Sequence, residues 1–413
     1  MKKSAIQLAG IGMLALAGAA RPALAKDGGG QPSGYRQTNL VADTAGAAAV
    51  TDPNLVNPWG LARGPSTPWW VADNGKGVAT IYDQTGATQL AAVAIPNVPG
   101  VADPSPPTGA VFNGSATDFV VAAGQPAHFL FALATGGIAG WNAGPSAALL
   151  VNRGGSAVYT GLTIARLHDA NVLYAANFAG GSVDVFDAAF HPVALAAGAF
   201  ADPSLPANFA PFNVQALGGD LVVTFAARQP NSAFEAHGPG QGAVEIFSAD
   251  GTRRLRLQQG AWFNAPWGVA RAPEHFAGSG HPLLIGQFGG GQIASFDPGS
   301  GRFLGLLNAS NGRPLAIDGI WALRFGNDAA AGPADTLFFT AGPQLGAHGL
   351  FGSLTAIGGD DHDAPGNAPG NGDDNDLGND SDHGQGNGSG GGPGGAPGNS
   401  GPGGGMGGGP GQH

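Results

Sequence analysis

Oxygen-bearing side chains recur at one position of a repeated sequence pattern, and they have the clearest chemical potential in this chain. Asp73, Asn177 and Gln287 each end a short apolar run and precede a glycine-containing turn. Carboxylate and amide oxygens are the ligands that Ca²⁺ and similar hard cations prefer. A cation held there would act as a Lewis acid on a lactone or ester carbonyl. The pattern therefore raises the hypothesis of a metal site formed by these three residues, with Ca²⁺ or another divalent cation as its ion.

Further polar residues accompany this position or stand at the start of a repeat. We expect a ligand-binding set made of Asn57, Asp73, Asn74, Asn177, Asn213, Arg228, Gln287 and Asp318. Arg228 precedes a loop over residues 229–240 that also holds Glu235 and His237. A long loop on an otherwise tight scaffold is a common place for function, and an arginine there is able to hold a carboxylate or another anion.

The same residue types also have a purely structural use. Asn and Asp at strand ends commonly bond the backbone of their own turns. The chain contains no H-E-x-x-H, G-x-S-x-G or P-loop motif, and its histidines show no metal-ligand spacing. No catalytic residue can therefore be named, and we favour a protein that is not an enzyme. Trp59, Trp267 and Trp321 recur at one repeat position, which favours packing over ligand binding.

The elements that must position these residues come in six similar segments about 50 residues apart. The segments are centred on Trp59, Thr108, Thr160, Phe212, Trp267 and Trp321. Each holds short β-type runs separated by Gly, Pro, Asn and Asp turns, without the apolar spacing of a long helix. Such a period is typical of a β-propeller. We therefore predict an all-β fold, a six-bladed propeller of four-stranded blades over residues 35–357.

The ends of the repeat region predict how the ring closes. The last repeat has three runs, near residues 318–323, 335–340 and 349–355, and lacks a fourth. A lone run at 35–42 precedes the first repeat, and we expect it to complete the last blade. In the third repeat the fourth run is expected near residues 194–200. Because successive strands are antiparallel, the polar residues named above should meet on one face around the central opening.

Both ends of the chain differ from the repeats. Residues 1–25 have a charged start, an apolar stretch and an Ala-Leu-Ala site, the pattern of a secretory signal peptide. We predict that residues 26–34 form a flexible lead. Residues 358–413 are rich in Gly, Asp, Asn and Pro, which predicts a disordered tail. Its acidic segment from Asp373 to Asp380 could alternatively bind Ca²⁺ weakly.

Composition limits the partners. The formal net charge is −11 and the chain has no cysteine, so disulfides are excluded and nucleic acid is disfavoured. Beyond the signal peptide no apolar run is long enough to span a membrane. We expect an exported protein, periplasmic or extracellular, that is a monomer and meets an extracellular ligand or a component of the cell envelope.

Several motifs resemble a known group of proteins. They are residues 57–62 (NPWGLA), 70–75 (WVADNG), 264–270 (NAPWGVA), 317–323 (IDGIWAL) and 339–343 (FTAGP). They resemble a family of uncharacterised exported bacterial proteins, some with PEP-CTERM-type sorting tails, that is similar to NHL-type six-bladed propellers. The chain departs from that family at its end, which lacks the Pro-Glu-Pro motif, the apolar helix and the basic cluster.

Two functions of different classes follow. The leading expectation is an exported binding or scaffold propeller whose unknown ligand meets the polar face around the channel. The alternative is a divalent-metal-dependent hydrolase, lactonase-like or esterase-like, by analogy with six-bladed lactonases that hold one ion in the channel. A third possibility is that the tail carries the binding function.

Overall fold

The computed structural model describes residues 32–101, 106–122, 124–230, 232 and 234–358. The predicted signal peptide, residues 26–31 of the predicted lead and, apart from Gly358, the predicted tail lie outside these residues. Among the residues that the structure describes, no helix has both the length and the apolar character needed to cross a membrane.

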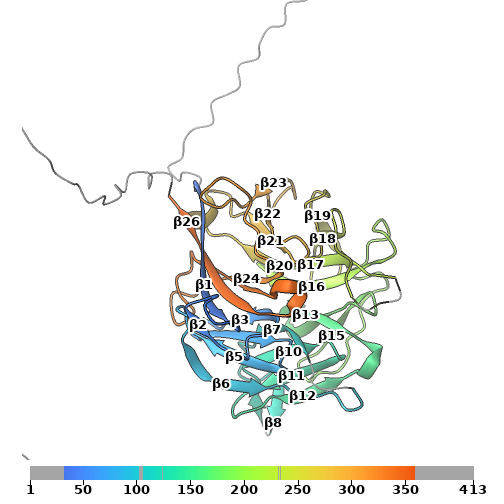
Figure 1. The fold of residues 1–413 in the computed structure, drawn as a ribbon. Coiled ribbons are helices and arrows are strands. Elements are labelled where there is room, and N and C mark those ends of the chain that lie inside the picture. Colours follow the sequence, from blue (N-terminus) through green and yellow to red (C-terminus); the bar gives the residue numbers. More distant parts are fainter. Residues whose placement is uncertain (1–31, 102–105, 123, 231, 233, 359–413) are drawn as a thin grey trace, which may run out of the picture. The chain divides into compact units, whose positions relative to one another are not determined.

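Six β-sheets surround a central axis, as predicted (Figure 1). Blade one consists of β3 (Pro58–Ala62), β4 (Trp69–Asp73), β5 (Val78–Tyr82) and β6 (Thr88–Ala94). Blade two consists of β7 (Pro107–Phe112), β10 (Phe129–Leu133), β11 (Gly137–Trp141) and β12 (Ala148–Asn152), with a small hairpin of β8 (Val120–Ala122) and β9 (Gln125–Pro126) beside it. Blade three consists of β13 (Tyr159–Leu167), β14 (Ala170–Asn177) and β15 (Ser182–Phe186).

The second half repeats this plan. Blade four consists of β16 (Phe209–Leu217), β17 (Asp220–Ala227), β18 (Gly242–Phe247) and β19 (Arg253–Arg256). Blade five consists of β20 (Pro266–Arg271), β21 (Leu283–Gln287), β22 (Ile293–Phe296) and β23 (Phe303–Leu306), with the short helix α1 (Glu274–Ala277) between its first two strands. Blade six consists of β24 (Ile320–Phe325), β25 (Leu337–Ala341), β26 (Leu350–Ile357) and β1 (Gly34–Ala42), with β2 (Val50–Thr51) at its edge and the short helix α2 (Pro343–Gly346) before β26.

The ring closes through the N-terminal strand. β1 runs antiparallel to β26, from the pair Gly34 and Ile357 to the pair Ala42 and Leu350. Figure 1 shows the two strands side by side, blue against orange. The lone strand predicted before the first repeat is thus confirmed as the outer strand of blade six.

Blade three corrects one expectation, because it has three strands and no fourth near residues 194–200. Only a single bridge, between Phe186 and Pro192, continues the ladder. The N–H groups of Asp187 and Val193 hold this bridge by donating to the carbonyl oxygens of His191 and Val185, at 2.9 and 2.8 Å, and the ladder goes no further. The apolar residues of this segment pack sideways instead: Phe200 contacts Tyr174 and Phe247, with ring centroids 5.8 and 5.3 Å apart. Hydrophobic burial rather than strand pairing holds the segment.

The first strands of the blades form a tight ring around the axis. Each packs against the first strand of the next blade, and β24 of the last blade packs against β3 of the first. A Cβ added at Gly60 would lie 2.4 Å from the Thr108 carbonyl oxygen, and one at Gly268 would lie 2.3 Å from the Trp321 carbonyl oxygen. Only glycine permits this approach. The space left inside the ring is about 10 Å³, barely one water.

Candidate functional site

Aromatic side chains from the starts of the inner strands converge at the axis. The indole of Trp321 is stacked between Trp59 and Phe288, with centroid separations of 3.7 and 3.8 Å. Trp267 meets Trp321 edge-on at 5.8 Å, and Phe212 lies 5.9 Å from the same ring. The three tryptophans therefore pack against one another, and the cluster closes the ring at this end.

A repeated backbone turn leads into the three tryptophan-bearing strands. The residues two positions before the tryptophans are Asn57, Ala265 and Gly319, with φ values of 47°, 50° and 67°. Glycine adopts this left-handed conformation freely and asparagine tolerates it, whereas alanine is strained. The same local conformation in blades one, five and six thus sets how the indoles enter the axis.

A cavity of about 350 Å³ lies over this cluster. Its aromatic and large aliphatic lining includes Trp59, Phe212, Phe288, Trp321, Phe234 and Leu345. The last two are exposed, at 70% and 80%, although large apolar residues usually avoid water. The volume lies within the range of small-molecule sites, which are typically apolar with a few convergent polar groups.

Two amide side chains line the cavity, but their hydrogen bonds go to other groups of the protein. Asn57 donates from Nδ2 to Asn74 Oδ1 at 3.2 Å, and its own Oδ1 accepts from the indole N–H of Trp321 at 3.1 Å. Asn74 donates to the Pro107 carbonyl oxygen at 3.2 Å. The indole Nε1 of Trp59 is buried and has no acceptor within the part of the chain that the structure describes.

Glu235 provides the carboxylate of the cavity. Its side chain is 13% exposed, and Oε1 lies 3.2 Å from Nε2 of His237. The imidazole of His237 in turn meets Phe288 edge-on at 5.3 Å. Oε2 makes no hydrogen bond within the described residues, and no lysine or arginine lines this cavity. The cavity is therefore aromatic with one negative group.

The three residues of the predicted metal set do not line this cavity. Each is buried within its own blade, with at most 5% exposure. Asn177 Oδ1 accepts the N–H groups of Val158 and Gly180, at 3.2 and 2.9 Å. Gln287 Oε1 accepts the N–H of Asn264 at 2.9 Å. These amide oxygens thus satisfy the backbone of turns, which is the structural use anticipated for them.

Asp73 is the exception, because its buried carboxyl group makes no well-formed hydrogen bond in the described structure. Burial raises the pKa of Asp73 well above its ordinary value, an effect that Thr80 partly opposes and Asp52 reinforces. Among the described residues, no group of three His, Cys, Asp or Glu side chains is placed to hold a metal ion. Asn177 and Gln287 thus direct their side-chain oxygens to turn N–H groups, and the predicted metal site stays a prediction.

The remaining predicted residues are dispersed. Asn213 is buried and donates to the Trp267 carbonyl oxygen at 2.8 Å. Arg228 donates to the Ala179 carbonyl oxygen at 3.0 Å and lines a separate, shallow depression. Asp318 accepts the Gln344 N–H at 2.8 Å. It therefore holds the turn that carries Leu345 at the cavity rim.

Sequence reasoning missed most of the cavity lining. The loop over residues 229–240 was singled out by its length, and it supplies Phe234 and Glu235. Nothing in the sequence marked Leu345, whose apolar side chain becomes notable only through its exposure. Phe288, the residue after Gln287, lines the cavity as well, although only Gln287 was predicted to bind a ligand.

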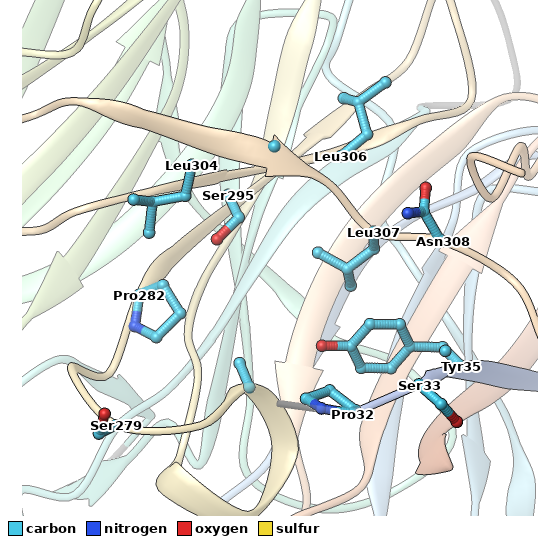
Figure 2. Close-up of a pocket in the computed structure, with 13 residues that line it drawn as sticks. Pro32, Ser33, Tyr35, Ser279, Pro282, Ser295, Leu304, Leu306, Leu307 and Asn308 are labelled. Atoms are coloured by element: carbon cyan, nitrogen blue, oxygen red, sulfur yellow. The ribbon is translucent and has the colours of Figure 1, made fainter. Parts of the chain in front are cut away.

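A second cavity, of about 390 Å³, lies where the start of β1 meets blade five. Figure 2 shows Tyr35 between Pro32 and Leu307, with Leu304, Ser295 and Pro282 on the other side. The hydroxyl of Tyr35 donates to the Phe276 carbonyl oxygen at 3.1 Å. No acidic or basic side chain lines this space. The axial cavity, with its convergent functional groups, is the better candidate site.

The comparisons with known proteins place the chain in a family. No protein-family model matches it. Two proteins of Acanthamoeba polyphaga mimivirus are similar over most of its length. Uncharacterized protein R648 is 30% identical over 332 residues, which cover 76% of this chain and 78% of the viral protein. Uncharacterized protein L690 is 31% identical over 338 residues, which cover 78% and 85%.

The chain belongs to the same family as these two viral proteins. Its expected membership of an exported bacterial family stays a prediction. A structural genomics protein of unknown function from Bacteroides thetaiotaomicron VPI-5482 aligns with a TM-score of 0.51 and 9% identity, covering 78% of this chain and 76% of that one. A streptogramin B lyase aligns with a TM-score of 0.46 and 12% identity over 78% and 97%. Likeness at these identities concerns the fold, not the activity.

Proposed function

We propose that the protein is an exported binding propeller that takes a small ligand into the aromatic cavity at the mouth of its ring. The ligand has an apolar, ring-sized body and a positively charged, hydrogen-bond-donating group. The observation that carries this proposal is the placing of one carboxylate, Glu235, in a cavity whose other large side chains are aromatic or aliphatic. Export rests on the signal-peptide pattern of residues 1–25.

The lining explains the proposed preference. Aromatic walls favour burial of apolar surface at roughly 25 cal/mol per Å², and their faces attract cations within about 6 Å of the ring centre. Glu235 Oε2 offers a charge-assisted hydrogen bond to an ammonium group. An anionic ligand would meet the Glu235 carboxylate without a compensating cation.

The exposed rim residues support a binding role. Phe234 and Leu345 come from blade four and blade six and line the same cavity. Apolar side chains that stand in water next to a cavity commonly mark binding sites. A ligand that covers both would remove this apolar surface from water. The hydrolase alternative gains no comparable support, because Asp73, Asn177 and Gln287 do not line this cavity.

Three matched probes test the proposal: benzylammonium, benzyl alcohol and benzoate. Titration calorimetry and tryptophan fluorescence both apply, because Trp59 and Trp321 line the cavity. We expect saturable one-site binding in the order cation, neutral molecule, anion. Glu235→Gln should weaken binding of the cation about tenfold, or about 1.4 kcal/mol, and leave the neutral probe unchanged.

Two further variants sharpen the test. Glu274→Gln removes an exposed glutamate in α1 and should leave every affinity unchanged. Phe234→Ser alters an exposed rim residue, so the fold should persist while all three probes bind more weakly. Absence of saturable binding by any probe, or equal affinities for the cation in wild type and Glu235→Gln, would overturn the proposal.

A further inference from the structure

Three arginine side chains converge at the opposite mouth of the ring. Arg63 directly follows β3, Arg271 ends β20 and Arg324 lies near the end of β24. Because the inner strands run in the same direction around the axis, these ends share the face opposite the aromatic cavity. The three arginines line a cavity of about 170 Å³ together with Gln215 and apolar residues, and no acidic side chain lines it.

The hydrogen bonds of the cluster are incomplete. Arg63 is anchored, with Nε donating to the Phe325 carbonyl oxygen at 2.8 Å and a terminal nitrogen donating to the Gly326 carbonyl oxygen at 2.7 Å. The guanidinium groups of Arg271 and Arg324 make no hydrogen bond or ion pair within the described residues. Each guanidinium carries five N–H donors, so most donors of this cluster are unused.

The electrostatics of the cluster are equally uncompensated. Arg324 is partly buried, and burial together with the positive charge of Arg63 lowers the pKa of Arg324 to about 10. Asp328 acts on Arg63 from a distance but forms no ion pair with it, and its Oδ1 accepts the Ala334 N–H. Like charges gathered without a partner raise the free energy of the folded state, in a chain whose net charge is −11.

We propose that this mouth is a binding site for a small oxyanion, a phosphate or carboxylate group of a small molecule. Arginine forks match the planar and tetrahedral oxygens of such groups and bind them with paired, charge-assisted hydrogen bonds. A cavity of about 170 Å³ suits one such group and not a polyanion. The fixed guanidinium of Arg63 would position the anion, and Arg271 and Arg324 would supply the free donors.

This site is separate from the aromatic cavity. The ring between the two mouths leaves only about 10 Å³ of space. Asn213 and the tryptophan cluster fill the intervening axis, and Asn213 donates to the backbone of Trp267. The proposal therefore goes beyond the proposed function, and either one can fail while the other holds.

Calorimetric titration of the full chain with inorganic phosphate, and with succinate as the carboxylate probe, tests the site. Both titrations are made at constant ionic strength in chloride. We expect one saturable site for at least one probe, with affinity that falls as sodium chloride is raised. Arg324→Gln should weaken it at least tenfold and Arg271→Gln at least threefold. Arg36→Gln, which removes an exposed arginine of β1, should leave it unchanged.

One of these variants should stay folded, so a loss of binding can be distinguished from a loss of the fold. Arg324 is partly buried, whereas Arg271 is exposed, so Arg271→Gln should keep the wild-type circular dichroism spectrum and melting temperature. Preference for phosphate or for succinate would identify the source of the oxyanion and support the site in either case. Absence of saturable binding by both probes overturns the proposal, as does wild-type affinity in both Arg271→Gln and Arg324→Gln.

Discussion

Trp321 of the last blade donates its indole N–H to the side-chain oxygen of Asn57 in the turn that enters the first blade, with the two atoms 3.1 Å apart. This hydrogen bond crosses the junction where the ring closes. It also couples the floor of the aromatic cavity to a residue whose backbone is in the left-handed region, at φ 47°. The position therefore needs both an unusual backbone conformation and a side-chain acceptor.

The variant Asn57→Gly separates these two needs. Glycine retains the backbone conformation but removes the acceptor, so the partly buried indole N–H of Trp321 is left without a partner. We expect the free energy of unfolding to fall by about 1–3 kcal/mol, measured by urea denaturation. In a Trp321→Phe background the same change should cost clearly less, because no donor remains. Equal costs in the two backgrounds would show that the hydrogen bond contributes nothing.

Because the inner strands lie so close together, replacing a glycine by alanine should destabilise the protein inside the ring but not at an open position outside it. Gly268→Ala would place a Cβ 2.3 Å from the Trp321 carbonyl oxygen, a backbone atom that cannot rotate away. We expect a loss of about 2–3 kcal/mol of stability, because overpacking forces the two strands apart. Gly155→Ala is the matched control, since a Cβ there meets nothing within 4 Å. A thermal melt in which both variants match the wild type would contradict the packing described for the ring.

The closing strand β1 should be indispensable to the fold. Val41 is fully buried in that strand, whereas Thr38 is exposed. Val41→Asp places an unpaired charge in the core, so we expect a loss of at least about 3 kcal/mol. Thr38→Asp should cost less than about 1 kcal/mol. Chemical denaturation of both variants checks the difference, and a small effect of Val41→Asp would mean that the ring is stable without its closing strand.

The fold could be predicted from the sequence because local sequence patterns specify it. Apolar runs of strand length, glycine turns and a period near 50 residues predicted the six blades, and the unpaired run at 35–42 predicted the closure. One feature of blade three was predicted wrongly, namely a fourth strand near residues 194–200. Whether an apolar segment such as residues 194–200 pairs as a strand or packs sideways through Phe200 depends on neighbours in another blade, which the local pattern does not contain.

The candidate site could be predicted from the sequence much less well than the fold. Asn57 and Asn74 line the aromatic cavity, but sequence position could not tell which strand-end side chains point into the channel mouth. Asn177 and Gln287 occupy the equivalent repeat position and are buried against turn N–H groups. The cavity instead depends on side chains from several blades meeting at one point, among them Phe234 and Leu345, whose positions no local pattern specifies.

The buried carboxyl group of Asp73 predicts a stability that depends on pH. The folded state raises the pKa of Asp73 well above its ordinary value, chiefly through burial. Below about pH 4 the carboxyl group is mostly protonated in both the folded and the unfolded state, so its burial does not reduce the free energy of unfolding through ionisation. As the pH rises toward the folded-state pKa, the unfolded chain ionises first and is favoured. Stability should therefore decline by about 1.4 kcal/mol for each pH unit over which only the unfolded state is ionised.

The variant Asp73→Asn should remove this decline. The equivalent positions in blades three and five carry the amides of Asn177 and Gln287, so an uncharged polar side chain is compatible with the strand end. We expect Asp73→Asn to exceed the wild type in stability at pH 7 and to differ little from it at pH 4, by urea denaturation at both values. Asp169→Asn, at a fully exposed carboxylate, provides the control and should follow the wild type. If wild type and Asp73→Asn instead change in parallel between pH 4 and pH 7, Asp73 is ionised in the folded protein at neutral pH. Its carboxylate would then need a cationic partner, and the case for an ion bound in blade one would reopen.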